Sequence, residues 1–216
     1  MTAVVSAIFG AYDRPKPVPA QSVDCTFTMV TDDAALDAPG WDLRGMLVPP
    51  SDPRMAAKGP KLRPWNFSTL VGPWIWIDAS FQIVSPTFVE EVTAAADGHL
   101  LAMWEHPDRA CIYPEAELSA TLPKYADTPV LKQAAEYRAA GHPMRWGLWA
   151  AGLIVYRDAV DDLADLWWTE MECWGYQDQI SLPVALRATQ IRPKALPWGL
   201  RSNPWLRLVP HADGTC

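Results

Sequence analysis

Short apolar runs that end abruptly in polar residues restrict the fold of this chain more than any other feature of its sequence. In the clearest of them, WIWID at residues 74–78, the apolar run stops at Asp78. Comparable runs occupy residues 3–10, 25–33, 99–107 and 152–158. Strands that are buried on both faces and carry polar residues at their carboxyl ends are typical of α/β sheets, in which ligands bind beyond those ends.

Segments with helical signals lie between these runs. Residues 158–175 place acidic side chains before an amphipathic stretch, as a helix dipole favours. In residues 55–70 we expect a short helix that is broken at Pro60 or Pro64. Further helices are predicted within residues 85–97, 113–121, 128–141 and 178–189. This alternation predicts a three-layer α/β domain with a mainly parallel sheet.

Length and charge restrict the possible partners. The 216 residues suit one domain, so we expect 1–216 to fold as a single unit in which 187–216 form an irregular tail rich in Pro and Trp. The net charge of −7 gives no general attraction for nucleic acid or an anionic membrane, and a phosphate-bearing ligand would need a local basic pocket or a metal. The N-terminal apolar run is too short for a signal peptide or a membrane span, which favours a cytoplasmic protein.

Asp78 is placed where a divalent cation, and through it a diphosphate, can bind. The structural alternative is that Asp78 only caps the turn after its strand. Polar residues that follow the first two apolar runs can share the same crevice: Tyr12, Asp13, Asp32 and Asp33. A ligand site at this edge of the sheet is therefore predicted.

Three segments, in the same order along the chain, resemble the retaining glycosyltransferases that use nucleotide sugars. In residues 56–80 a lysine and an apolar stretch precede Asp78, where those enzymes have a D-x-D motif. The segments LWAAGLIVY, residues 148–156, and GYQDQISL, residues 175–182, are similar to their acceptor-side strand and their D-Q pair. The resemblance implies transfer of a glycosyl group.

A closer resemblance, over residues 4 to about 186, is to the TOD1/MUCI70 family of glycosyltransferase-like proteins. Its most specific blocks are EHPDRACIYPEA, residues 105–116, and QDQIS, residues 177–181. The resemblance implies a GT-A fold, in which a Rossmann-like nucleotide-binding half and an acceptor half share one mixed, mainly parallel sheet. It also implies roles for individual residues.

On the nucleotide side, the resemblance implies that Gly10 lets the backbone approach the donor and that Tyr12 stacks on its base. Asp32 or Asp33 would bond the base or the ribose. The structural alternatives are a simple turn at Gly10, a surface tyrosine at Tyr12 and a helix cap at the two aspartates.

Four basic or ionisable side chains are candidates for contact with the diphosphate. Lys58 and Lys61, of which we favour Lys61, would supply positive charge, and a solvated basic loop is the alternative. Arg109 would clamp phosphate in a bidentate fashion, and His106 would bond the donor sugar or phosphate. The alternative for this second pair is a network that braces a proline-containing loop.

The candidate catalytic residues are Asp178 and Gln179. They begin a predicted helix, where Asp178 would by default be the N-cap. The resemblance implies that this D-Q pair faces the anomeric carbon and the hydroxyls of the donor sugar. A carboxylate and an amide in that position would stabilise the developing positive charge and orient the sugar.

The candidate metal ligands depart from the D-x-D pattern of the retaining glycosyltransferases. A D-x-D motif supplies two carboxylates, whereas this chain has Asp78-Ala79-Ser80. Serine is a neutral and weak ligand, so affinity for Mn²⁺ or Mg²⁺ should be reduced unless Gln82 or His211 compensates. His211 is a candidate because GT-A enzymes often complete their metal site with a C-terminal histidine.

The favoured function is transfer of a sugar from a nucleoside diphosphate donor, expected to be uridine-linked, to a hydroxyl of a glycan, protein or lipid. Retention of configuration is suggested by the D-Q and AAG similarities alone. Ser80 motivates one alternative, a non-catalytic nucleotide-sugar-binding protein. A metal-dependent hydrolase in the same crevice is another, because a fold does not fix its reaction.

Overall fold

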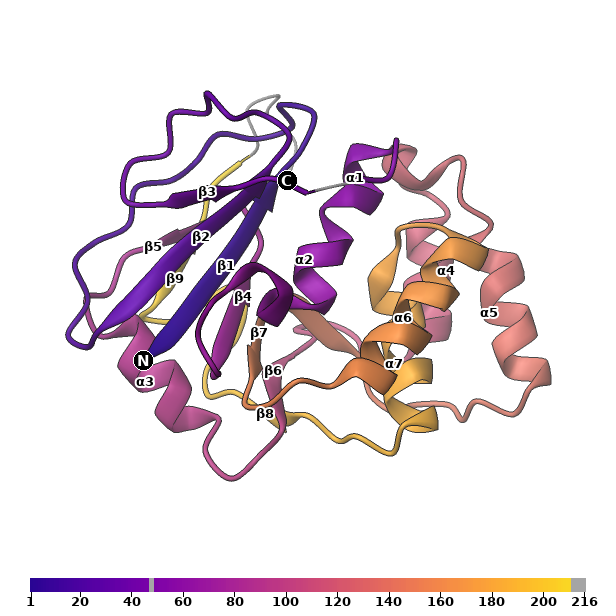
Figure 1. Cartoon of the computed structure of the whole chain (residues 1–216). Coiled ribbons are helices and arrows are strands. Elements are labelled where there is room, and N and C mark those ends of the chain that lie inside the picture. The colour runs from indigo at the N-terminus through magenta and orange to yellow at the C-terminus, as the bar shows by residue number, and fades with distance from the viewer. Residues whose placement is uncertain (47–48, 211–216) are drawn as a thin grey trace.

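The computed structural model describes residues 1–46 and 49–210, and a seven-stranded sheet forms its centre (Figure 1). Its strands are β1 (Thr2–Ile8), β2 (Cys25–Thr31), β3 (Asp42–Arg44), β4 (Trp74–Ile77), β6 (Leu101–Glu105), β7 (Trp149–Tyr156) and β8 (Lys194–Ala195). They lie in the order β3-β2-β1-β4-β7-β6-β8. Neighbours are parallel except that β7 is antiparallel to β4 and to β6, which confirms the mixed, mainly parallel sheet.

Helices occupy the segments in which they were predicted, and two short ones, at residues 53–56 and 123–125, were not predicted. They are α1 (Pro53–Ala56), α2 (Lys58–Leu62), α3 (Phe88–Ala95), α4 (Ile112–Ser119), α5 (Val130–Ala139), α6 (Asp161–Trp174) and α7 (Asp178–Ala188), with 3-10 turns η1 (Pro64–Phe67) and η2 (Pro123–Tyr125). Within the described ranges, no helix combines the length and the apolar character that a membrane span needs.

Strand β1 is buried along its whole length because helices cover both faces of the sheet. Ala3, Val5 and Ala7 pack in a core with residues of α2, α6 and α7. Val4 and Ile8 point to the opposite face and pack in a second core with α3. Figure 1 shows α3 on one side of the sheet and α6 and α7 on the other, so the predicted three layers are confirmed.

The helical segment 55–70 breaks at one of the two predicted prolines. Pro64 separates α2 from η1, whereas Pro60 lies in the first turn of α2, where a missing N–H breaks no helical hydrogen bond. A separate helix, α1, begins at Pro53 and is capped by Asp52, whose carboxylate accepts from the backbone N–H of Arg54 at 2.8 Å. The short helices α1 and α2 therefore meet beside β1.

The C-terminal segment is less irregular than predicted. Strand β8 adds to the edge of the main sheet beside β6, and β9 (Leu206–Leu208) pairs antiparallel with β5 (Phe81–Ile83). The backbone N–H of Val209 then donates to the carbonyl of Ser80 at 2.8 Å. Strands this short carry no readable alternation, which is why the sequence pattern missed them. The tail thus braces the chain just after Asp78.

Candidate active site

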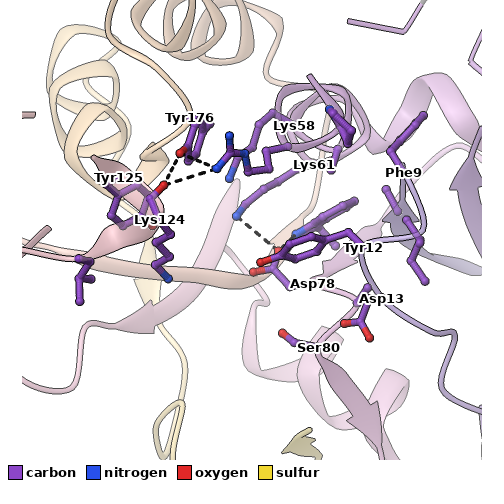
Figure 2. Close-up of a pocket in the computed structure, with 18 of the residues that line it drawn as sticks. Phe9, Tyr12, Asp13, Lys58, Lys61, Asp78, Ser80, Lys124, Tyr125 and Tyr176 are labelled. Carbon is purple, nitrogen blue, oxygen red and sulfur yellow. Dashed lines mark hydrogen bonds and ion pairs between the residues drawn. The ribbon is translucent and has the colours of Figure 1, made fainter. Parts of the chain in front are cut away.

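A cavity of about 610 Å³ opens beyond the carboxyl ends of the parallel strands β1 and β4 (Figure 2). Its walls come from the segments that follow these two strands, from α1 and α2, from η2, and from Tyr176. This is the edge of the sheet at which the sequence predicted a ligand site. Tyr12, Asp13, Lys58, Lys61, Asp78 and Ser80 all line the cavity.

Asp78 is held in a fixed orientation by three neighbours. Its backbone N–H donates to the carbonyl of Gly152 at 2.8 Å, and its Oδ1 accepts from Nε1 of Trp76 at 2.8 Å. The ammonium of Lys61 is 3.4 Å from the same oxygen. A Cβ at Gly152 would lie 2.7 Å from the Phe81 ring and 3.2 Å from Oδ2 of Asp78, so this approach requires glycine. The carboxylate remains 40% exposed toward the cavity.

Two lysines and one carboxylate form a buried cluster beneath the cavity. Oδ2 of Asp178 is 2.8 Å from Nζ of Lys58 and 2.7 Å from Nζ of Lys61. Lys61 lies between Asp178 and Asp78 and thus links the start of α7 to the end of β4. Tyr156 donates to the backbone carbonyl of Lys61 at 2.8 Å, which anchors α2 against the sheet. We call Lys58, Lys61 and Asp178 the lysine cluster.

The charged groups of the lysine cluster stabilise one another in their ionised forms. Burial by itself would raise the pKa of Asp178, but the two ammonium groups and their hydrogen bonds outweigh it and hold that pKa below its ordinary value. Burial lowers the pKa of Lys58, only partly offset by Asp178. For Lys61, the attraction of Asp178 and Asp78 outweighs burial and raises the pKa. Asp178 is therefore ionised and Lys61 protonated at neutral pH.

Aromatic rings flank the cavity on two sides. Figure 2 shows Tyr12 on one side and Tyr125 and Tyr176 on the other, with the ring centroids of the latter pair 5.7 Å apart. The guanidinium of Arg54 lies 3.9 Å from the ring centroid of Tyr176 and also donates to its hydroxyl at 2.7 Å. Nζ of Lys124 is 5.1 Å from the centroid of Tyr125. Flat apolar surface and positive charge thus occur together around the opening.

Residues 46–197 match the family model of the TOD1/MUCI70, glycosyltransferase-like domain. The chain belongs to this family. No curated protein matches it. Among solved structures, the apo structure of the WbbM bifunctional glycosyltransferase matches with a TM-score of 0.48 and 11% identity, covering 91% of this chain. The match covers 38% of the length of that protein.

The nucleotide-side residues that the TOD1/MUCI70 resemblance implied are only partly at the cavity. Tyr12 lines it, whereas the carboxylate of Asp32 accepts from the backbone N–H of Gly10 at 3.1 and 3.0 Å. Asp33 accepts from the backbone N–H of Ala35 at 2.9 Å, as a local cap does. Gly10 has φ +62°, and a Cβ there would approach Pro53 to 2.7 Å. Asp32 therefore shapes the turn beside the cavity.

The block 105–116 forms a network of its own. Nε of Arg109 donates to Glu115, and its Nη2 lies 3.3 Å from Nε2 of His106. Nδ1 of His106 accepts from the backbone N–H groups of Asp108 and Arg109, each at 3.2 Å. Neither His106 nor Arg109 is among the described residues that line the cavity. These contacts match the bracing network that the sequence left open as an alternative.

The D-Q pair of the family lies at the start of α7, but its carboxylate does not cap the helix. The side chain of Asp178 is directed to the lysines, and Gln177 holds the N-cap position without a side-chain cap bond. Gln179 donates to the backbone carbonyl of Trp149 at 3.3 Å. Asp178 is buried behind Lys58 and Lys61, so a ligand in the cavity would meet the ammonium groups first.

Two of the predicted cation ligands, Asp78 and Ser80, line the cavity in the part of the chain that the structure describes. No group of three His, Cys, Asp or Glu side chains within that part is arranged to hold a metal ion. Asp78 already accepts hydrogen bonds from Trp76 and Lys61, and Ser80 adds only a neutral oxygen. His211 lies outside the described residues, so its role stays a prediction.

Sequence reasoning missed several residues of the cavity. Arg54 comes from the short helix α1, and Lys124 and Tyr125 come from the 3-10 turn η2, neither of which carries a recognisable motif. Tyr176 lies between α6 and α7, within the segment 175–182, of which only the D-Q pair was singled out. Trp76 was not among the candidate site residues, although its indole N–H fixes Asp78. The one available signal was its position two residues before Asp78, since alternate strand residues point to the same face.

Proposed function

We propose that this protein transfers a sugar from a nucleoside diphosphate donor, uridine-linked, to a hydroxyl of an acceptor. One observation carries the proposal: two lysines, fixed by the buried Asp178, present their ammonium groups to a cavity that Asp78 also lines. Membership of the glycosyltransferase-like family supports this reaction class.

The cavity suggests an orientation for the donor. Lys58 and Lys61 would bind the diphosphate by charge-assisted hydrogen bonds, which are stronger than neutral ones. Tyr12 would stack on the base at one end. Asp78, with one oxygen held by Trp76, would direct its other oxygen to the transferred sugar. Its negative charge would stabilise the positive charge that develops at the anomeric carbon.

Asp178 acts in this proposal through the lysines and is a positioning residue. Its carboxylate fixes both ammonium groups before the donor arrives, so less ordering is needed on binding. Direct contact of Gln179 with the sugar, and retention of configuration, stay predictions. The acceptor would enter beside Tyr125 and Tyr176, whose rings offer stacking surface for a sugar.

A second candidate is a non-catalytic protein that binds nucleotide sugars. It is favoured by Ser80, which stands where a second carboxylate would be expected. A metal-dependent hydrolase is a weaker alternative, because Asp78 and Ser80 do not fit a cation site among the described residues.

A donor screen tests the proposal. The purified protein is incubated with UDP-, GDP- and dTDP-sugars, with and without a mixture of acceptor glycans, and released nucleoside diphosphate is measured. We expect turnover with one donor and a loss of about a hundredfold in Asp78→Asn, which keeps the shape of the side chain without its charge. Asp97→Asn, on an exposed side chain paired with Arg157, is the matched control. Binding of a donor without turnover would support the non-catalytic alternative.

A further inference from the structure

Basic side chains outnumber acidic ones on the wall of the cavity. Among the described residues, the basic side chains Arg54, Lys58, Lys61 and Lys124 line the cavity, together with the acids Asp13 and Asp78. Asp13 pairs with Lys16, Asp52 pairs with Arg54, and Asp178 pairs with Lys58 and Lys61 from below. With these partners included, five basic side chains stand against four carboxylates. The cavity wall itself carries four basic side chains and two acids, so positive charge faces a ligand that brings a diphosphate.

Asp78 is poorly disposed to hold a cation in this arrangement. Its Oδ1 receives the indole N–H of Trp76 at 2.8 Å and faces the ammonium of Lys61 at 3.4 Å. A divalent ion bound to this carboxylate would lie close to that ammonium, which like-charge repulsion opposes. Ser80 contributes no charge to offset this repulsion.

Lys61 has the geometry to take the place of a cation. An ammonium carries three N–H donors, and Lys61 directs them to Asp178 at 2.7 Å and Asp78 at 3.4 Å, with one donor left for a phosphate oxygen. Its side chain is only 4% exposed, so its charge acts where water screens little. Lys58, 17% exposed, stands beside it on the same carboxylate.

We infer that the lysine cluster, supported by Arg54 and Lys124, binds the diphosphate of the donor directly and without a divalent cation. This inference deepens the proposed function and rests on it for the identity of the ligand as a nucleoside diphosphate sugar. Asp178 then has a positioning role: its carboxylate holds the ammonium groups of Lys58 and Lys61 close together while the cavity is empty.

Titration calorimetry with UDP and with inorganic pyrophosphate tests the inference, in EDTA and then in Mn²⁺ or Mg²⁺. We expect both probes to bind in EDTA and the dissociation constant for UDP to change by less than about threefold when the cation is added. Lys61→Met should weaken both probes at least about tenfold. Lys132→Met, which removes an exposed lysine of α5 outside the cavity, is the matched control.

The outcomes separate this inference from the proposed function. Binding that disappears in EDTA and returns with Mn²⁺ overturns the inference, and loss of that Mn²⁺ response in His211→Ala would assign the ion a ligand. If a donor sugar is turned over only with the cation, the proposed function stands and the inference fails. If pyrophosphate binds in EDTA through Lys61 but no donor is turned over, the inference stands and the transferase proposal fails.

The inference can be tested even if Lys61→Met fails to fold. The comparison of EDTA with Mn²⁺ uses the unaltered protein. Lys124→Met changes an exposed side chain of η2 and should weaken pyrophosphate by about threefold without altering the thermal transition. An unchanged pyrophosphate affinity in both Lys124→Met and folded Lys61→Met would overturn the inference.

Discussion

The indole Nε1 of Trp76 donates a 2.8 Å hydrogen bond to Oδ1 of Asp78, so a residue of the core sets the direction of a carboxylate that lines the cavity. Trp76 lies near the end of β4 and Asp78 follows that strand directly, and Trp76 is only 2% exposed. Its ring therefore has little freedom to turn away. Through this hydrogen bond, the packing of Trp76 in the core fixes the orientation of Asp78 in the cavity.

Trp76→Phe should separate these two effects. The substitution keeps an aromatic ring but removes the donor to Asp78, so we expect about a tenfold loss of kcat and a loss of about 1–3 kcal/mol of stability from the smaller ring. Trp104→Phe removes a buried indole that donates to the carbonyl of Pro197, away from the cavity. It should lose similar stability while kcat stays within about twofold. Equal kcat in both variants would contradict the role given to Trp76.

Asp178→Asn should destabilise the fold at neutral pH, because two buried ammonium groups lose their common counter-charge. We expect a loss of about 3–5 kcal/mol, measured by urea unfolding at pH 7. Removing one lysine as well, in Lys58→Met with Asp178→Asn, should recover part of it, since Lys61 keeps Asp78 as a partner. No recovery in the double variant would show that repulsion between the lysines is not the cause.

The ion pairs of Asp178 should make part of the protein's stability sensitive to acid. The pKa of Asp178 in the fold lies below its ordinary value, so its ion pairs contribute fully above the unfolded pKa of about 3.9 and are lost as pH falls through and below it. The unaltered protein should therefore lose more stability between about pH 5 and pH 3 than Asp178→Asn does. Parallel loss in both proteins would contradict this account.

Gly152→Ala should disturb Asp78 by steric pressure from the neighbouring strand. The new Cβ would lie 2.7 Å from the Phe81 ring and 3.2 Å from Oδ2 of Asp78. We expect a loss of about 1–3 kcal/mol of stability together with reduced donor turnover. Gly199→Ala, where a Cβ has no heavy atom within 4 Å, is the control and should change neither. The thermal transition and the rate of nucleoside diphosphate release are the measurements.

His142 predicts a second pH effect away from the cavity. Burial, with a smaller contribution from Arg187, lowers the pKa of His142 to about 4. In the unfolded chain His142 binds a proton near pH 6.5, so its contribution to the free energy of unfolding is complete above that pH. As the pH falls from about 6.5 to about 4, the protein should lose on the order of 1–3 kcal/mol of stability. In His142→Gln, urea unfolding should show a smaller loss of stability between these two pH values. His99→Gln, at an exposed position, should leave it unchanged.

The sequence was sufficient for the layers but not for the contacts of the cavity. The end of the apolar run WIWID located Asp78, and the alternation of strands and helices predicted the sheet, because both depend on local periodicity. The ion pair between Lys61 and Asp178 was out of reach, since it joins two helices that are far apart in the chain. The resemblance identified both residues as candidates, but could not show that they bind each other.

For His106 and Arg109 the difficulty was of another kind. Their residue types suit phosphate binding and internal bracing equally well, and only the direction of their side chains separates the two. The structure directs Arg109 to Glu115. Tyr125 and Tyr176 were missed because a 3-10 turn and the connection between two helices carry no periodic signal that points into a cavity.

The pairing of β9 with β5 determines when the segment after Asp78 can complete its structure during synthesis. The segment that follows Asp78 leaves the ribosome well before its partner strand, Leu206–Leu208, is synthesised. Until then, the backbone around Phe81 has no antiparallel neighbour there. A ribosome stalled before β9 should thus display a formed β1–β2 pair beside an unbraced Asp78 loop, and protease should cut that loop only in the stalled chain.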